Sequence, residues 1–164
     1  MRRPKKPDTD AGDADERTVR TAALALLAGR DFGRAELSRR LERRGYPAAI
    51  VSAVVEGLVA ERLLSETRFV EQFIVQHAGR GHGPVRIRAE LRERGVPDSD
   101  IEAGLEAAGE DWAALARDTR RRRFGLSPPD DYPERARQAR FLQYRGFSAD
   151  HIRAALGAGD DIET

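Results

Sequence analysis

Apolar side chains recur along the chain at helical spacing, in three successive blocks of similar layout. In each block two short amphipathic stripes precede a third, and in the first block Asp31-Phe32-Gly33 separates the opening stripe from the next. Apolar residues at i, i+1, i+4, i+5 and i+8 mark a helix with one buried face. Each block therefore predicts three helices. The stripes of the first block are Val19, Ala23, Leu26 and Leu27; Leu37 and Leu41; and Ile50, Val51, Val54, Val55 and Leu58.

One turn sequence ends the second predicted helix of every block. Arg44-Gly45-Tyr46-Pro47 returns as Arg94-Gly95-Val96-Pro97 and, more loosely, as Arg145-Gly146-Phe147-Ser148. The copies lie about 50 residues apart, a spacing typical of one supersecondary unit repeated along a chain. We predict an all-α protein of three tandem three-helix repeats that forms an elongated, curved, solenoid-like molecule. The expected ranges are 17–64, 65–110 and 111–158 for the repeats, 1–16 for a disordered tail and 159–164 for a C-terminal tail.

The repeated glycine has a structural role in this pattern. If Gly45 ends its helix in the left-handed conformation, a Schellman cap brings Leu41 and Tyr46 together. Pro47 then fits the first turn of the next helix, where a missing N–H costs nothing. The turn positions expected on these grounds are Gly45, Gly81, Gly83, Pro84, Gly95 and Gly146.

Composition narrows the classes of protein. Hydrophobic residues make up 40% of the chain, enough for a core, and there is no cysteine. Disulfides and thiolate metal sites are therefore excluded, and a cytoplasmic location is expected. The first sixteen residues lack the apolar segment of a leader, and no window approaches the ~20 apolar residues of a membrane span. We expect no membrane partner.

No catalytic constellation stands out. His77 falls on an apolar stripe, which favours a packed histidine over a metal ligand. His82 follows five residues later in a glycine-rich loop, a poor helical spacing for a metal pair, and no carboxylate completes a recognisable site with these two or with His151. The segment 79–84 is glycine-rich but lacks the Lys-Ser/Thr ending of a P-loop and follows a helix. We predict a protein that is not an enzyme, with no catalytic residue, metal or cofactor.

Arginine is the more informative residue type. Of the 29 basic residues only Lys5 and Lys6 are lysines. Arginine presents a planar fork that suits phosphate or carboxylate, although a compositional bias of the genome explains the same preference and a single arginine is most simply a solvated one. The candidate contacts to an anionic partner are Arg40, Arg44, Arg80, Arg86 and Arg88, and the run Arg120 to Arg123 is a further basic cluster.

Residues 63–96 carry a more specific pattern. Leu63-Leu64-Ser65-Glu66-Thr67-Arg68-Phe69-Val70, then the segment 81–91 (Gly-His-Gly-Pro-Val-Arg-Ile-Arg-Ala-Glu-Leu) and Gly95-Val96, resembles the RecX family of recombination regulators. The likeness runs from about Arg17 to Leu156. It implies a bacterial cytoplasmic protein that binds the RecA recombinase, lodges in the groove of its filament on single-stranded DNA and restrains ATPase, strand exchange and co-protease activity. It also implies binding to single-stranded DNA, with duplex DNA as a further target. We expect the protein to act as a monomer.

Two other functions fit parts of the pattern. Ala35 to Leu41, Gly45 and a third helix ending near Leu64 resemble the helical part of a winged-helix transcription regulator. No β-hairpin signal follows Leu64, however, and the matching third helix of the second repeat is acidic. The remaining alternative is a helical scaffold that binds no nucleic acid.

Overall fold

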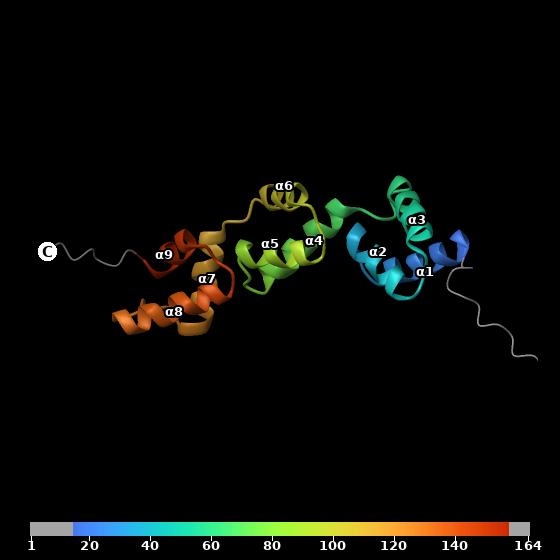
Figure 1. The fold of residues 1–164 in the computed structure, drawn as a ribbon. Helices are drawn as coiled ribbons and strands as arrows, with labels where there is room; N and C mark the ends of the chain where they lie inside the picture. The colour runs from blue at the N-terminus through green and yellow to red at the C-terminus, as the bar shows by residue number, and fades with distance from the viewer. Residues whose placement is uncertain (1–14, 158–164) are drawn as a thin grey trace, which may run out of the picture. The chain divides into compact units, whose positions relative to one another are not determined.

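The computed structural model of the protein describes residues 15–157, which form nine α-helices and no strand (Figure 1). The predicted all-α class with three repeats of three helices is confirmed. The helices are α1 (Glu16–Gly29), α2 (Arg34–Arg43) and α3 (Ala48–Ala60); α4 (Glu66–Gly79), α5 (Pro84–Glu93) and α6 (Asp98–Ala108); and α7 (Trp112–Phe124), α8 (Tyr132–Tyr144) and α9 (Ala149–Leu156).

The two expected tails fall almost entirely outside the described residues, which leave out 1–14 and 158–164. At the boundary between the expected N-terminal tail and the first repeat, the first helix begins at Glu16, one residue earlier than expected. The reason is a side-chain cap, because the Asp15 carboxylate accepts a hydrogen bond from the Thr18 N–H at 2.8 Å. That bond, with a second from the Thr18 hydroxyl, lowers the pKa of Asp15 below its usual 3.8. Among residues 15–157, no helix is long and apolar enough to cross a bilayer.

Residue contacts divide the chain into two compact units. Of the described residues, unit 1 holds 15–69 together with 94–96, and unit 2 holds 70–93 and 97–157. The core of unit 1 gathers the apolar faces of α1, α2 and α3, as the spacing of apolar positions predicts. Its buried members are Val19, Ala23, Phe32, Leu37, Leu41, Val51, Val54, Val55, Leu58 and Leu64.

Glycine caps end several of the helices. At the end of α2, Gly45 has φ 92°. Its N–H donates to the carbonyl of Glu42 at 2.9 Å, and the N–H of Tyr46 donates to the carbonyl of Leu41 at 3.4 Å. These are the two bonds of the Schellman cap predicted from the sequence. The end of α8 repeats them around Gly146, with donor–acceptor distances of 3.0 and 3.1 Å.

The prolines after these caps differ from the prediction. Pro47 is the N-cap of α3, not a residue of its first turn, and has φ −62° and ψ 136°. Its extended ψ keeps it outside the helix, while its carbonyl accepts the first helical hydrogen bond, from the N–H of Val51 at 3.0 Å. Pro97 has the same role before α6. Only Pro84 takes the first helical position, in α5.

Within unit 2, backbone hydrogen bonds join the turn before α5 to the turn after α8. The N–H of Gly83 donates to the carbonyl of Arg145, and the N–H of Val85 donates to the carbonyl of Gly146, both at 2.9 Å. A Cβ atom at Gly83 would lie 2.4 Å from the Gly146 carbonyl oxygen. The glycine-rich segment 79–84 is therefore a packing junction between repeats, where only backbone without side chains can approach so closely.

Candidate functional site

The arginines predicted as contacts at the C-terminal end of α2 have exposed side chains. Arg40 and Arg44 are exposed, lie one turn apart, and make no side-chain hydrogen bond or ion pair among the described residues. Both belong to unit 1. They give this unit a pair of unneutralised guanidinium groups on one side of a helix end, where cations are favoured by the helix dipole.

Two of the predicted arginines in unit 2 already have partners. The Arg86 Nε atom donates to Glu90 at 2.8 Å. Arg88 binds both oxygens of the Glu102 carboxylate, at 2.6 and 3.1 Å. This paired hydrogen bond lowers the pKa of Glu102 and raises that of Arg88. An anionic partner would have to displace or share these carboxylates to reach Arg86 or Arg88.

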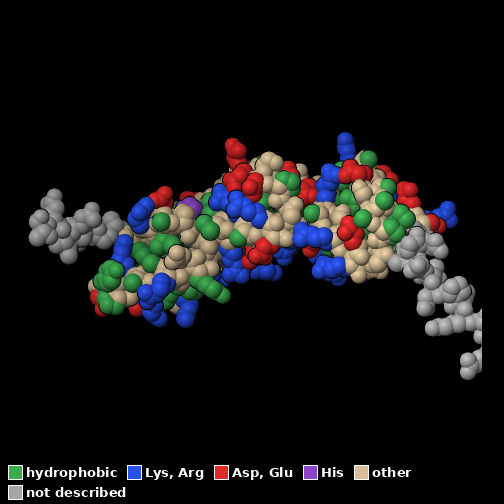
Figure 2. All heavy atoms as spheres, in the orientation of Figure 1, with side chains coloured by type: hydrophobic (Ala, Val, Ile, Leu, Met, Phe, Trp, Pro, Cys, Tyr) green, Lys and Arg blue, Asp and Glu red, His purple; other side chains and the backbone are tan. Residues whose placement is uncertain are grey.

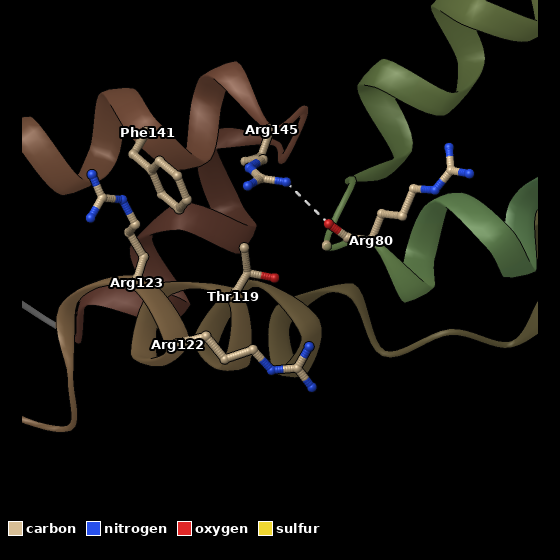
Figure 3. Close-up of a pocket in the computed structure, with 7 residues that line it drawn as sticks. Arg80, Thr119, Arg122, Arg123, Phe141 and Arg145 are labelled. Carbon is tan, nitrogen blue, oxygen red and sulfur yellow. Dashed lines mark hydrogen bonds between the residues drawn. The ribbon is translucent and has the colours of Figure 1, made fainter.

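Arg80 lies at the rim of a pocket of about 220 Å³ in unit 2 (Figure 3). Its side chain is exposed, and its carbonyl accepts a hydrogen bond from Arg145 Nη1 at 3.1 Å. Four arginines and no carboxylate line the pocket, which therefore has a positive potential. The lining residues are Arg80, Gly81, Thr119, Arg122, Arg123, Phe141 and Arg145.

Local sequence explains how these side chains come together. On α7, Thr119, Arg122 and Arg123 have the i, i+3, i+4 spacing that places side chains on one face. Gly81 lies against this face, since a Cβ at its φ of 75° would stand 2.9 Å from the Thr119 hydroxyl oxygen. The end of α8 supplies Phe141 and Arg145, whose guanidinium carbon stands 5.3 Å from the ring centroid of Phe141.

Arg120 has a different role from the rest of its run. It is only 4% exposed. Its guanidinium donates to the side-chain oxygen of Gln138 and to the carbonyl of Ser127, each at 3.1 Å, and also to the carbonyls of Gly125 and Leu126. Arg120 therefore fixes the connection from α7 to α8, and only Arg121 to Arg123 of the basic run are exposed.

The space-filling view shows basic side chains near α5 and α8 (Figure 2). Figure 2 shows Lys and Arg side chains (blue) gathered below α5 and along the lower edge of α8. In Figure 3 the Phe141 ring lies between the Arg123 and Arg145 side chains, with Thr119 below it. Guanidinium forks bind phosphates, and an aromatic face stacks with a base. Thr119 is the only hydroxyl in the lining, and no acid or histidine stands beside it to act as a base.

Two of the three histidines, His77 and His82, are packed in the interior, as predicted for His77. His77 and His82 are each 8% exposed. Their Nδ1 atoms lie 2.9 Å apart, and His77 stacks on Phe73 with ring centroids 4.0 Å apart. Burial, followed by the positive charge of Arg86, lowers the pKa of His82 below 6.5. Among residues 15–157, no three His, Asp or Glu side chains are placed to hold a metal ion.

The sequence identifies several residues of this pocket but does not predict that they meet. The run from Arg120 to Arg123 was a visible signal, but the pattern gave no reason to separate Arg120 from the others. Arg145 is marked in the sequence only as part of the repeated turn, and no sequence signal marks Phe141 or Thr119. They meet Arg80 because the turn after α4 packs on the turn after α8, a contact that links residues 65 positions apart.

The composition and burial of α3 argue against the winged-helix alternative. The helix that would enter the major groove, α3, contains no basic residue and has four buried apolar side chains. No strand follows it within the described residues, so no wing is formed there. Recognition helices of this class need polar or basic side chains on the face toward DNA.

Comparison with known proteins identifies related chains. Models of the first, second and third three-helix domains of RecX match residues 20–58, 65–105 and 110–156. A protein named Regulatory protein RecX from Halorhodospira halophila is 52% identical over 153 residues, which is 93% of this chain and 94% of the relative. Another of that name from Pseudomonas savastanoi pv. phaseolicola is 46% identical over 144 residues, covering 87% and 93% of the two chains.

Solved structures of similar fold carry the same family name. A crystal structure of RecX from Lactobacillus salivarius superimposes with a TM-score of 0.69 at 22% identity, covering 86% of this chain and 94% of that one. A second crystal structure, of regulatory protein RecX, gives a TM-score of 0.69 at 19% identity and covers 85% and 70% of the two chains. At these identities the likeness concerns the fold.

Proposed function

The chain belongs to the RecX family of regulatory proteins, and from this premise we propose that it binds the RecA recombinase filament assembled on single-stranded DNA. In this proposal binding restrains the ATPase, strand exchange and co-protease activities of the filament. The chain acts in the cytoplasm as a monomer and performs no chemistry of its own.

The observation that carries this proposal is the presence of unpaired arginines in both units. Unit 1 offers Arg40 and Arg44, and unit 2 offers Arg80 with the exposed arginines of α7. A polymer of identical subunits on an anionic strand repeats its binding features along its length. Two separate basic surfaces on one chain allow bivalent engagement of such a polymer, which raises avidity far above that of either surface alone.

The proposal separates two kinds of arginine. Arg40, Arg44 and Arg80 have side chains free of ion pairs, so their full charge is available for RecA or DNA. Arg86 and Arg88 keep their predicted role as contacts, but they reach a partner only by exchanging Glu90 and Glu102 for its anionic groups. Because both internal pairs are partly exposed, solvent screens them and the exchange costs little.

A binding measurement with matched charge variants tests the function. The chain, labelled with a fluorophore, is titrated with RecA filaments assembled on single-stranded DNA with a non-hydrolysable nucleotide, and anisotropy is followed. We expect saturable binding that weakens at least 10-fold in the double variant Arg40→Glu with Arg44→Glu. The control is Arg17→Glu with Arg153→Glu, which changes net charge by the same amount at other exposed positions. No binding of the unmodified chain would refute the proposed function, and equal losses in both variants would refute the role of Arg40 and Arg44.

A further inference from the structure

The pocket between α7, α8 and the turn after α4 is lined by an aromatic ring and a hydroxyl group as well as by arginines. Binding of an anion by charge alone would require only the arginines. The wall of the pocket is the ring of Phe141, with the Thr119 hydroxyl beside it, and both are largely enclosed by protein. Arginine side chains surround this wall, and those of Arg80 and Arg122 extend away from it (Figure 3). The arginines alone are sufficient to bind phosphates. An aromatic wall in addition favours a ligand that has a flat apolar part.

The size of the pocket restricts that ligand. A volume of about 220 Å³ is below the ~300–1,000 Å³ of pockets for drug-sized molecules and dinucleotide cofactors. A single planar ring system with its sugar fits this space. The arginines that line it do not point at one spot. In Figure 3 the Arg123 side chain lies on one side of Phe141, and those of Arg80 and Arg122 extend from the other.

We propose that this pocket accepts one unpaired base of a single-stranded nucleic acid, which stacks on Phe141 while Arg123 on one side and Arg80 and Arg122 on the other bind the flanking phosphates. The Arg145 guanidinium lies over this ring, with its central carbon 5.3 Å from the ring centroid, and donates to the Arg80 carbonyl at 3.1 Å. The base therefore stacks on Phe141 when Arg145 moves aside, and the Thr119 hydroxyl offers a hydrogen-bond donor to the edge of the inserted base. A base within a duplex is stacked on both faces and paired along one edge, so it must be extruded from the duplex, at a cost in free energy, before it can enter the pocket. The pocket therefore discriminates single strands from duplexes.

This inference deepens the proposed function, since it assigns a subsite to the single strand that the filament carries, but its test needs no RecA. The chain is titrated against a single-stranded oligonucleotide of about 12 nucleotides with 2-aminopurine at its centre. The fluorescence of 2-aminopurine is quenched when the base stacks on an aromatic ring. We expect quenching on binding, and Phe141→Leu should abolish the quench and raise Kd about 10-fold or more.

Salt dependence separates the two kinds of contact. Phe141→Leu should leave the slope of log K against log salt unchanged, because leucine alters stacking and not charge. Arg122→Ala should lower that slope by about 0.7 while the bound base stays quenched. Because Arg122 is exposed, this second variant keeps the test valid if Phe141→Leu disturbs folding. Tyr132→Leu is the control, since Tyr132 is an exposed aromatic at the opposite end of α8 and does not line the pocket.

The outcomes are distinct. Absence of quenching in the unmodified chain, or an effect of Tyr132→Leu equal to that of Phe141→Leu, overturns the base-pocket proposal. Equally effective competition by an acidic peptide of the same charge overturns it in favour of a general site for acidic partners. Equal affinity for single strand and duplex also contradicts it. Each of these results leaves filament binding through RecA itself unaffected, so failure of the pocket proposal is separable from failure of the proposed function.

Discussion

Replacing Gly146 with alanine should separate the second and third repeats within unit 2. Gly146 has φ 93°, and a Cβ there would lie 2.2 Å from the Cβ of Arg86 and 2.7 Å from its backbone nitrogen. Carbon atoms in contact need about 3.5–4.0 Å, so the turn after α8 must retreat by more than 1 Å. The Val85 N–H to Gly146 carbonyl bond, now 2.9 Å, then exceeds hydrogen-bonding distance.

The expected cost is the sum of conformational and packing terms. A non-glycine residue in the left-handed region costs about 1–2 kcal/mol. Loss of the hydrogen bonds from Val85 and Gly83 adds about 1 kcal/mol each, and more where a buried group is left unsatisfied. The total is about 3–5 kcal/mol, a large part of the about 5–15 kcal/mol that stabilises a typical domain. Gly109→Ala is the matched control, because Gly109 has φ 56° but no atom within 4 Å of its Cβ position.

The assay is urea unfolding followed by far-UV circular dichroism, with amide hydrogen exchange as the local readout. Gly109→Ala should cost only the conformational term. Gly146→Ala should cost about 2–3 kcal/mol more and should speed exchange at the N–H groups of Gly83 and Val85. Equal free energies of unfolding in the two variants, with unchanged exchange at these amides, would refute the assignment of the glycine turns as a packing junction.

Three further predictions concern single residues. Gly57 lies inside α3 with nothing within 4 Å of its Cβ position. Gly57→Ala should therefore raise the free energy of unfolding by about 0.5–1 kcal/mol in urea titrations. A decrease in that free energy would show that the added methyl group meets an obstruction. Burial, then Arg86, lowers the pKa of His82 below 6.5. The unfolded chain therefore binds more protons, and stability should fall as pH drops below about 6.5; urea titrations of His82→Asn should show a weaker fall between pH 7.5 and 5.5, and an identical profile would argue against this account. Arg120→Met should cost about 3 kcal/mol or more by leaving its acceptors unpaired, and a loss below 1 kcal/mol would show that solvent replaces them.

Much of the fold is local in origin and was predictable from sequence. The apolar stripes identify α1, α2 and α3, and Leu37 and Leu41 are fully buried as their spacing requires. Gly45 and Gly146 form caps because the left-handed conformation favours glycine wherever it occurs. At the end of α3 the same bonds form around Arg62, with φ 61°. A cap without glycine carries no such sequence signal.

The candidate site was less predictable because it depends on contacts between distant residues. Sequence alone could not tell that Arg120 is interior while Arg122 is exposed, since both belong to one basic run. The same limit applies to Arg88, because its partner Glu102 is supplied by another helix. The five-residue spacing of His77 and His82 is a poor one for a pair on a single helix. The turn at Gly81 bends the chain back after α4 and brings them together.

The central claim is that this chain regulates the RecA filament, and the DNA-dependent ATPase rate of RecA tests it most directly. The rate is measured on saturating single-stranded DNA while the chain is added at a small fraction of the RecA concentration. We expect a fall in rate at substoichiometric amounts that persists when more DNA is added, since a regulator of the filament acts on many subunits at once. An unchanged rate near equimolar chain would contradict the claim, and so would a fall that excess DNA abolishes, because it would reveal simple competition for the strand.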